Sequence, residues 1–135
     1  MIPIPDDFEL QDPATIPIKK EEAREQARLV AALRRRWSVI ENLAQRPVVF
    51  HVANGGSRDA REASNLKIQG VLAGIPDLFI MMPMGEVIII EMKAKDGKVS
   101  DSQINLQKHF KALGHEVIVA HSAEEALAAL RRRVR

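Results

Sequence analysis

Two carboxylates face each other in a hairpin predicted for the middle of the chain. Residues 77–82 and 86–93 are rich in apolar and β-branched side chains, as strands are, and a Pro-Met-Gly turn separates them. With Met84 at the centre of that turn, Asp77 lies opposite Glu91, with about 5 Å between their Cβ atoms. Like charges in this position destabilise a strand pair, so a compensating positive charge is expected.

A divalent cation or an amine could supply that charge. Glu91 follows the apolar run 87–90, which reads as buried, and carboxylates are rarely buried without a partner. Lys93 is two residues further on and therefore lies on the same face. A hard cation with oxygen ligands would offset both carboxylates. Two simpler readings stay open: a solvated strand end, or a Glu91–Lys93 ion pair that leaves Asp77 unexplained.

The remaining elements follow from hydrophobic periodicity and capping signals. The expected elements are a helix over 20–36, a strand over 48–52, a helix from Ser57 to Gly70, a helix over 100–114, a strand over 116–121 and a helix after Ser122. Together with the hairpin, they give the order α-β-α-β-β-α-β-α, which predicts an α/β fold with a mixed sheet flanked by helices. Strands 86–93 and 116–121 should form a right-handed parallel crossover.

The first 18 residues differ from the rest of the chain. They contain four prolines, four acidic residues and no Lys or Arg, a local charge of −4 against +6 for the other 117 residues. The prolines forbid a continuous helix. We therefore expect an acidic, extended or disordered arm over 1–18 and one domain over 19–135.

Composition excludes several classes of protein. The chain has no cysteine, which excludes disulfides and Cys-ligated metals, and no Gly-rich GxxxxGK loop, which disfavours a nucleotide cofactor. No apolar run is long enough to span a bilayer, and the start of the chain does not read as a signal peptide, so a cytoplasmic location without a membrane partner is expected.

Several motifs together resemble a known family. Gly74-Ile75-Pro76-Asp77, followed after 13 residues by Glu91-Met92-Lys93, is similar to the PD-(D/E)XK nuclease motif. With the His-Val-Ala-Asn-Gly-Gly run at 51–56 and Ser-Asp-Ser-Gln at 100–103, the chain resembles stand-alone phage and bacterial members of the VRR-NUC family. The resemblance implies a restriction-endonuclease-like fold and a DNA nuclease that depends on Mg²⁺ or Mn²⁺, in a bacterial or phage-infected cell.

The resemblance also implies roles for particular residues. Asp77 and Glu91 would be metal ligands, with the backbone carbonyl of Met92 as a further ligand. Lys93 would orient the attacking water and stabilise charge on the phosphate. Gln103 would stand beside the lysine, although a glutamine at this position could equally serve the helix cap.

An acidic residue on the first helix is a further candidate ligand. Related nucleases often place one near the metal, and Glu22 is our candidate, with Glu21 and Glu25 as competitors. The simpler reading is a solvated glutamate favoured by the helix dipole.

A set of polar and basic residues is expected to contact DNA. These residues are His51, Asn54, Gly55, Gly56, Arg58, Arg61, Lys67, Lys95 and Lys98. His51 could instead be a hydrogen-bonded structural residue, and the Asn-Gly-Gly run could simply turn the chain.

The leading hypothesis is a structure-selective DNA endonuclease that resembles Holliday-junction resolvases and acts as a homodimer. One alternative is a non-catalytic DNA-binding or assembly subunit that keeps the fold. Another is a regulatory domain that binds a small acidic ligand.

Overall fold

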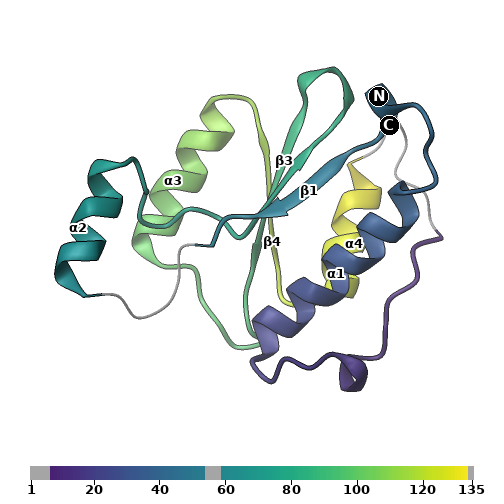
Figure 1. Ribbon diagram of the computed structural model, residues 1–135, viewed down its shortest axis with the longest axis horizontal. Coiled ribbons are helices and arrows are strands. Elements are labelled where there is room, and N and C mark those ends of the chain that lie inside the picture. The colour runs from purple at the N-terminus through teal and green to yellow at the C-terminus, as the bar shows by residue number, and fades with distance from the viewer. Residues whose placement is uncertain (1–6, 54–58, 134–135) are drawn as a thin grey trace.

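The computed structural model describes residues 7–53 and 59–133, and Figure 1 shows the arrangement of its elements. The bounds are α1 Glu21–Trp37, β1 Val48–His51, α2 Ala60–Ile68, β2 Leu78–Met81, β3 Val87–Met92, α3 Asp101–Ala112, β4 Glu116–Ala120 and α4 Ala123–Arg132. The order of helices and strands confirms the predicted α/β fold. None of the helices described is long and apolar enough to cross a membrane.

Within residues 7–53 and 59–133, four strands form one mixed sheet in the order β1-β2-β3-β4. β1 and β3 pair antiparallel with β2, and β4 pairs parallel with β3, as the crossover predicted. Leu78 lies opposite Ile90, so the hairpin has the predicted register. Met84 adopts a left-handed conformation, with φ of 65°, at the centre of the turn.

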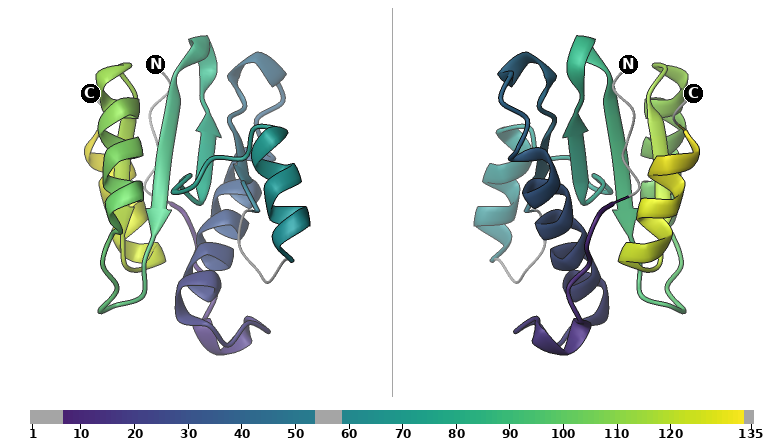
Figure 2. Two further views of the ribbon diagram at one scale, coloured as in Figure 1. Left: turned by 90° about the vertical axis from the view of Figure 1, so that its left-hand side faces the viewer. Right: turned by 90° about the vertical axis from the view of Figure 1, so that its right-hand side faces the viewer.

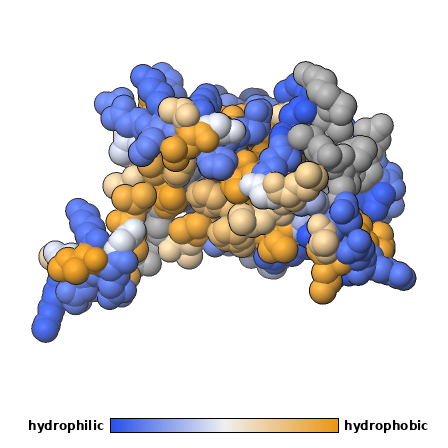
Figure 3. Space-filling model, turned by 90° about the horizontal axis from the view of Figure 1, so that it is seen from above, coloured by the Kyte–Doolittle hydropathy of each residue, from blue (hydrophilic) through white to orange (hydrophobic). Residues whose placement is uncertain are grey.

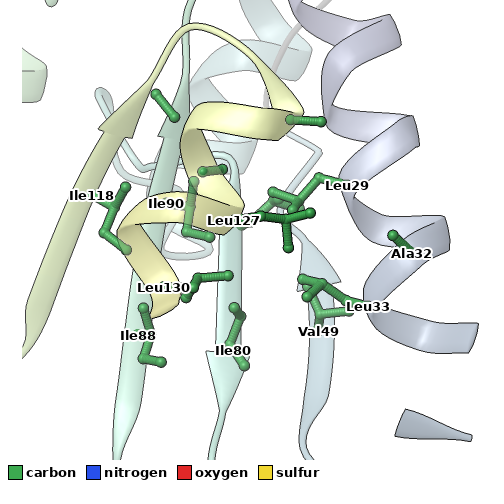
Figure 4. Close-up of a cluster of buried hydrophobic side chains, with 14 of the residues drawn as sticks. Leu29, Ala32, Leu33, Val49, Ile80, Ile88, Ile90, Ile118, Leu127 and Leu130 are labelled. Carbon is green, nitrogen blue, oxygen red and sulfur yellow. The ribbon is translucent and has the colours of Figure 1, made fainter. Parts of the chain in front are cut away.

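The core lies between one face of the sheet and two helices. Leu29 and Leu33 of α1 and Leu127 of α4 are buried against the sheet, as Figure 4 shows. On the opposite face, α3 packs against β4. Both faces of β3 are therefore covered, which explains the uninterrupted apolar run before Glu91.

Side-chain caps fix where α3 and α4 begin. The Ser100 hydroxyl accepts a hydrogen bond from the Gln103 backbone, and the Gln103 side chain accepts one from the Ser100 backbone, completing the predicted capping box. The Ser122 hydroxyl accepts from the Glu125 backbone at the start of α4. The second helix is shorter than predicted: α2 begins at Ala60 after an Asp59 cap and ends at Ile68.

The described part of the arm packs against the body of the protein. Residues 7–18 run past α1 and α4, seen at the right of Figure 2. Phe8 is 9% exposed and meets Trp37 edge to face, with ring centroids 6.2 Å apart. The Arg28 guanidinium donates to the Gln11 carbonyl at 2.7 Å. Burial of an aromatic ring offsets the entropy of ordering this stretch, and the division of the chain into an arm and a domain stays a prediction.

Candidate active site

A cavity of about 400 Å³ opens at the end of the sheet where β1 and β3 end and β2 begins. The first turns of α1 form one wall and the N-terminus of α3 forms another. Its lining residues are Lys20, Glu22, Ala23, Gln26, His51, Gly74, Ile75, Asp77, Glu91, Met92, Lys93, Ser100, Ser102 and Gln103. Most of the predicted chemical groups therefore meet in one place.

Asp77 and Glu91 are locked together across the hairpin. The Asp77 backbone N–H donates to Glu91 Oε1 at 3.2 Å, and the Met92 backbone N–H donates to Asp77 Oδ2 at 2.8 Å. Each carboxylate is thus bonded to the backbone of the other strand. This exchange fixes both groups at the mouth of the sheet, one residue beyond the last strand pair.

Glu91 is almost fully buried, with 2% of its surface exposed. Burial, together with the neighbouring Asp77 carboxylate, raises the pKa of Glu91 to about 8, although Lys93 acts in the opposite direction. Without a cation, this environment favours the protonated form of Glu91 at neutral pH. A cation placed between them would favour the ionised form.

Gln103 caps its helix and also contacts Glu91. Its Oε1 accepts from the Ser100 backbone N–H at 2.9 Å, so its Nε2 is left to donate, and it does so to Glu91 Oε2 at 2.5 Å. The helix cap therefore fixes which end of the amide faces Glu91. Both polar ends of this side chain are used within the protein.

Lys93 lies just past the end of β3 and points into the same cavity. Its Nζ is 3.5 Å from Glu91 Oε2, and its side chain is 15% exposed. The Lys93 backbone N–H donates to the Ala120 carbonyl at 2.9 Å, which continues the pairing with β4 beyond the strand. The predicted ion pair thus exists, and Asp77 stands beside it rather than apart from it.

The loop before Asp77 requires glycine at position 74 because the chain there passes close to the start of α3. Gly74 has φ of 79°, and a Cβ atom there would lie 2.8 Å from the Ser102 carbonyl carbon and 2.9 Å from the Gln103 backbone nitrogen. Only glycine tolerates both conditions. Pro76 is fully buried next to Asp77. The loop therefore packs directly on the N-terminus of α3.

His51 is held at the cavity by the backbone of Asp77. Its Nδ1 lies 2.7 Å from the Asp77 carbonyl, which also accepts from the Val52 backbone N–H at 3.1 Å. Because a carbonyl can only accept, Nδ1 carries a proton and donates it to this carbonyl. The structural role proposed for His51 is real, and its other nitrogen remains for a ligand.

The three glutamates of α1 have different surroundings. Glu22 lines the cavity, whereas Glu21 accepts from the Lys95 backbone N–H at 3.3 Å. Glu25 is buried on another side of the helix, 2.8 Å from Arg28, and accepts from the Ala123 backbone N–H. Of these three glutamates, Glu22 is the one that lines the cavity holding Asp77 and Glu91.

The predicted DNA-contacting residues are dispersed. Arg61 and Lys67 are exposed on α2, and Lys95 and Lys98 are exposed on the loop between β3 and α3. None of these four lines the cavity. The predictions for Asn54, Gly55, Gly56 and Arg58 lie outside the described residues.

Sequence reasoning did not identify Lys20, Gln26, Ser100 or Ser102 as part of the site, and all four line the cavity. For Gln26 a signal was available, since it lies four residues after Glu22 and therefore on the same helical face. The two serines could have been found only as neighbours of Gln103 at the helix start.

The donor set fits a hard divalent cation. Within residues 7–53 and 59–133, no three side chains of His, Cys, Asp or Glu are grouped closely enough to form a metal site alone. Mg²⁺, however, is commonly held by one or two carboxylates while water and substrate phosphate complete its shell. Asp77 and Glu91 supply that number of carboxylates, and a bound cation would oppose the rise in the pKa of Glu91 that burial and Asp77 cause.

A mixed sheet that brings Asp77, Glu91 and Lys93 together at one end has the arrangement of the PD-(D/E)XK nucleases. The chain belongs to the VRR-NUC family within that class: residues 21–124 match the family model described as VRR-NUC domain. This family implies a divalent metal. The match to the family model confirms the family that the sequence motifs resemble.

Comparison with known proteins agrees with this assignment. A solved structure titled "VRR_NUC domain protein" superposes with a TM-score of 0.61 and 20% identity, covering 85% of this chain and 88% of that one. Another solved structure, titled "VRR_NUC domain", superposes with a TM-score of 0.54 and 20% identity, covering 84% of this chain and 97% of that one. At this identity the two structures show the fold alone.

One curated relative is similar in sequence over a shorter stretch. It is described as "Putative nuclease p44" of Acyrthosiphon pisum secondary endosymbiont phage 1, and it is 37% identical over 51 residues. The match spans 38% of this chain and about half of the relative, 55% of its length.

Proposed function

We propose that this protein is a divalent-metal-dependent DNA endonuclease that selects branched DNA, in the manner of a Holliday-junction resolvase. The observation that carries the proposal is the pairing of Asp77 with the buried Glu91, with Lys93 3.5 Å from the same carboxylate. The Met92 carbonyl and Glu22 are candidate further ligands. Mg²⁺ and Mn²⁺ are the cations that suit such an oxygen set.

The protein's own groups have separable tasks in this scheme. Asp77 and Glu91 would hold the cation, which when bound would lower the pKa of a water molecule and polarise the scissile phosphate. The Lys93 ammonium orients the attacking water and stabilises charge on the phosphate. Gln103 keeps Glu91 Oε2 in place. In-line attack would leave a 5′-phosphate and a 3′-hydroxyl.

Cleavage of a labelled four-way junction, with linear duplex of the same sequence as comparison, tests the proposal. We expect cutting with Mg²⁺ or Mn²⁺, none with EDTA, and a preference for the junction. Lys93→Ala should lower the rate roughly 100-fold or more because it removes a charge at the transition state. Lys111→Ala, at an exposed position on α3, is the matched control.

The same experiment addresses the non-catalytic alternative. If the protein is only a DNA-binding subunit, the wild type and Lys93→Ala should bind the junction equally well, and neither should cleave it. Cleavage by both proteins at the same rate would instead assign the activity to another site or to a contaminant.

We further propose that the active form is a homodimer. The support is an apolar surface between the β1–β2 side of the sheet and the segment after α2. Phe50, Val71 and Leu72 are 39%, 40% and 55% exposed there, around a groove of about 450 Å³. α2, which projects at the left of Figure 3, buries none of its residues. A nine-residue helix is marginal alone, so a second copy packed on this surface would stabilise it.

A homodimer would also suit the substrate. Two symmetry-related active sites can cut two strands of one branched molecule. The exposed Arg61, Lys67, Lys95 and Lys98 would then contact phosphates on the DNA arms, which positions the substrate without reading its sequence.

A further inference from the structure

The cavity contains a second amide whose surroundings differ from those of Gln103. Gln26 lies on α1, one turn after Glu22, and is half-buried in the wall of the cavity. Among the described residues, no hydrogen bond reaches its side chain. Gln103, in contrast, uses both ends of its amide within the protein.

The position of Gln26 on the helix makes this difference informative. Further along the same face, Leu29 and Leu33 are fully buried in the core. The apolar stripe of α1 therefore turns polar where it reaches the cavity. Water reaches the Gln26 amide, so this group, which has no partner among the described residues, can exchange water for a bound ligand at little cost.

The charges around the cavity indicate what that ligand is. Three carboxyl groups line the cavity, those of Glu22, Asp77 and Glu91, and the ammonium groups of Lys20 and Lys93 lie 3.5 Å from Glu22 and Glu91. Because these two ammonium groups already have partners in the protein, a phosphate bound there needs further donors. An amide N–H can donate to a phosphate oxygen without adding charge. We propose that Gln26 is a substrate-binding residue, which donates a hydrogen bond to the DNA backbone beside the scissile phosphate.

This inference rests on the proposed nuclease function, and its test separates the two. DNA binding is measured by fluorescence anisotropy with a four-way junction and Mg²⁺ in the Lys93→Ala background, where cleavage does not interfere. Adding Gln26→Ala should weaken binding about tenfold, the effect of losing one hydrogen bond to a charged group. Gln26→Leu should do the same while keeping most of the side-chain volume, and Gln45→Ala, at an exposed position, should not.

Salt dependence distinguishes a contact with DNA from a loss of packing or of charge. Since Gln26 is neutral, its removal should leave the slope of log affinity against log salt unchanged, whereas Lys98→Ala should reduce the slope by about one. Thermal unfolding of Gln26→Leu should match that of its parent.

Two results would overturn the inference. If the Gln26 variants bind within twofold of the Lys93→Ala parent, Gln26 does not contact DNA, and the proposed function stands. If neither the Lys93→Ala parent nor the wild-type protein binds branched or linear DNA, the proposed function falls and the inference falls with it.

Discussion

At the scale of single residues, the molecule depends on a carboxylate that it does not fully compensate. Glu91 is buried beside Asp77, and its pKa is raised from 4.5 to about 8. In metal-free protein the folded state keeps the proton that the unfolded state loses near pH 4.5. The stabilising contribution of this group is therefore complete below pH 4.5 and is lost as pH rises to about 8.

Urea unfolding of the metal-free protein between pH 5 and 8.5 tests this expectation. The free energy of unfolding of the wild type should fall across that range, and Glu91→Gln should abolish this part of the fall. Glu41→Gln, at an exposed position, serves as control. Added Mg²⁺ should restore stability most at the alkaline end, because it favours the ionised carboxylate. A Glu91→Gln profile parallel to the wild type would contradict the assignment of the raised pKa.

At the scale of elements, the site depends on how closely one loop approaches one helix. Gly74→Ala would force a left-handed conformation on alanine and push its Cβ into the start of α3. We expect the free energy of unfolding to fall by about 1–2 kcal/mol because of the strained conformation and by about 1–3 kcal/mol because of the close contact. Because α3 carries Gln103, cleavage should fall as well.

Gly114→Ala is the matched control for this contact. Gly114 also has a positive φ, of 96°, but no atom of the described residues lies within 4 Å of a Cβ placed there. Its loss of stability, measured by urea unfolding, should therefore be the smaller of the two, with cleavage unchanged. Equal losses of stability in Gly74→Ala and Gly114→Ala would show that the close approach of the loop to α3 does not make Gly74 more sensitive to substitution.

At the scale of the whole molecule, the two faces of the sheet are covered unequally. α1 and α4 seal one face, and α3 packs over β4 on the other, which leaves Phe50 and the segment after α2 exposed. If a second copy covers this surface, the protein should be a dimer by light scattering. Leu72→Asp should then give a monomer, since it places a charge in an apolar contact.

Leu113→Asp provides the comparison for the dimer. Leu113 is 63% exposed at the end of α3 and does not line the groove. This variant should therefore remain dimeric. A wild-type protein that is monomeric at micromolar concentration would exclude the proposed interface.

The sequence by itself determined the elements, the hairpin register and the pairing of Asp77 with Glu91. These follow from local periodicity, from caps such as Ser100 and from the two-residue repeat of a strand, all of which act over a few residues. The family motif can be recognised in the sequence for the same reason, since most of its residues lie in one hairpin and at the start of one helix.

Only the tertiary structure decided which side chains from distant elements reach the site. The choice of Glu22 over Glu21 and Glu25 depends on how α1 is rotated against the sheet, and the presence of Gln26 in the cavity depends on the same rotation. The two roles of Gln103 required the actual position of α3. The packing of Phe8 on Trp37 depends on contacts between segments almost 30 residues apart. Such placements are set by packing across the whole core, which local sequence patterns do not encode.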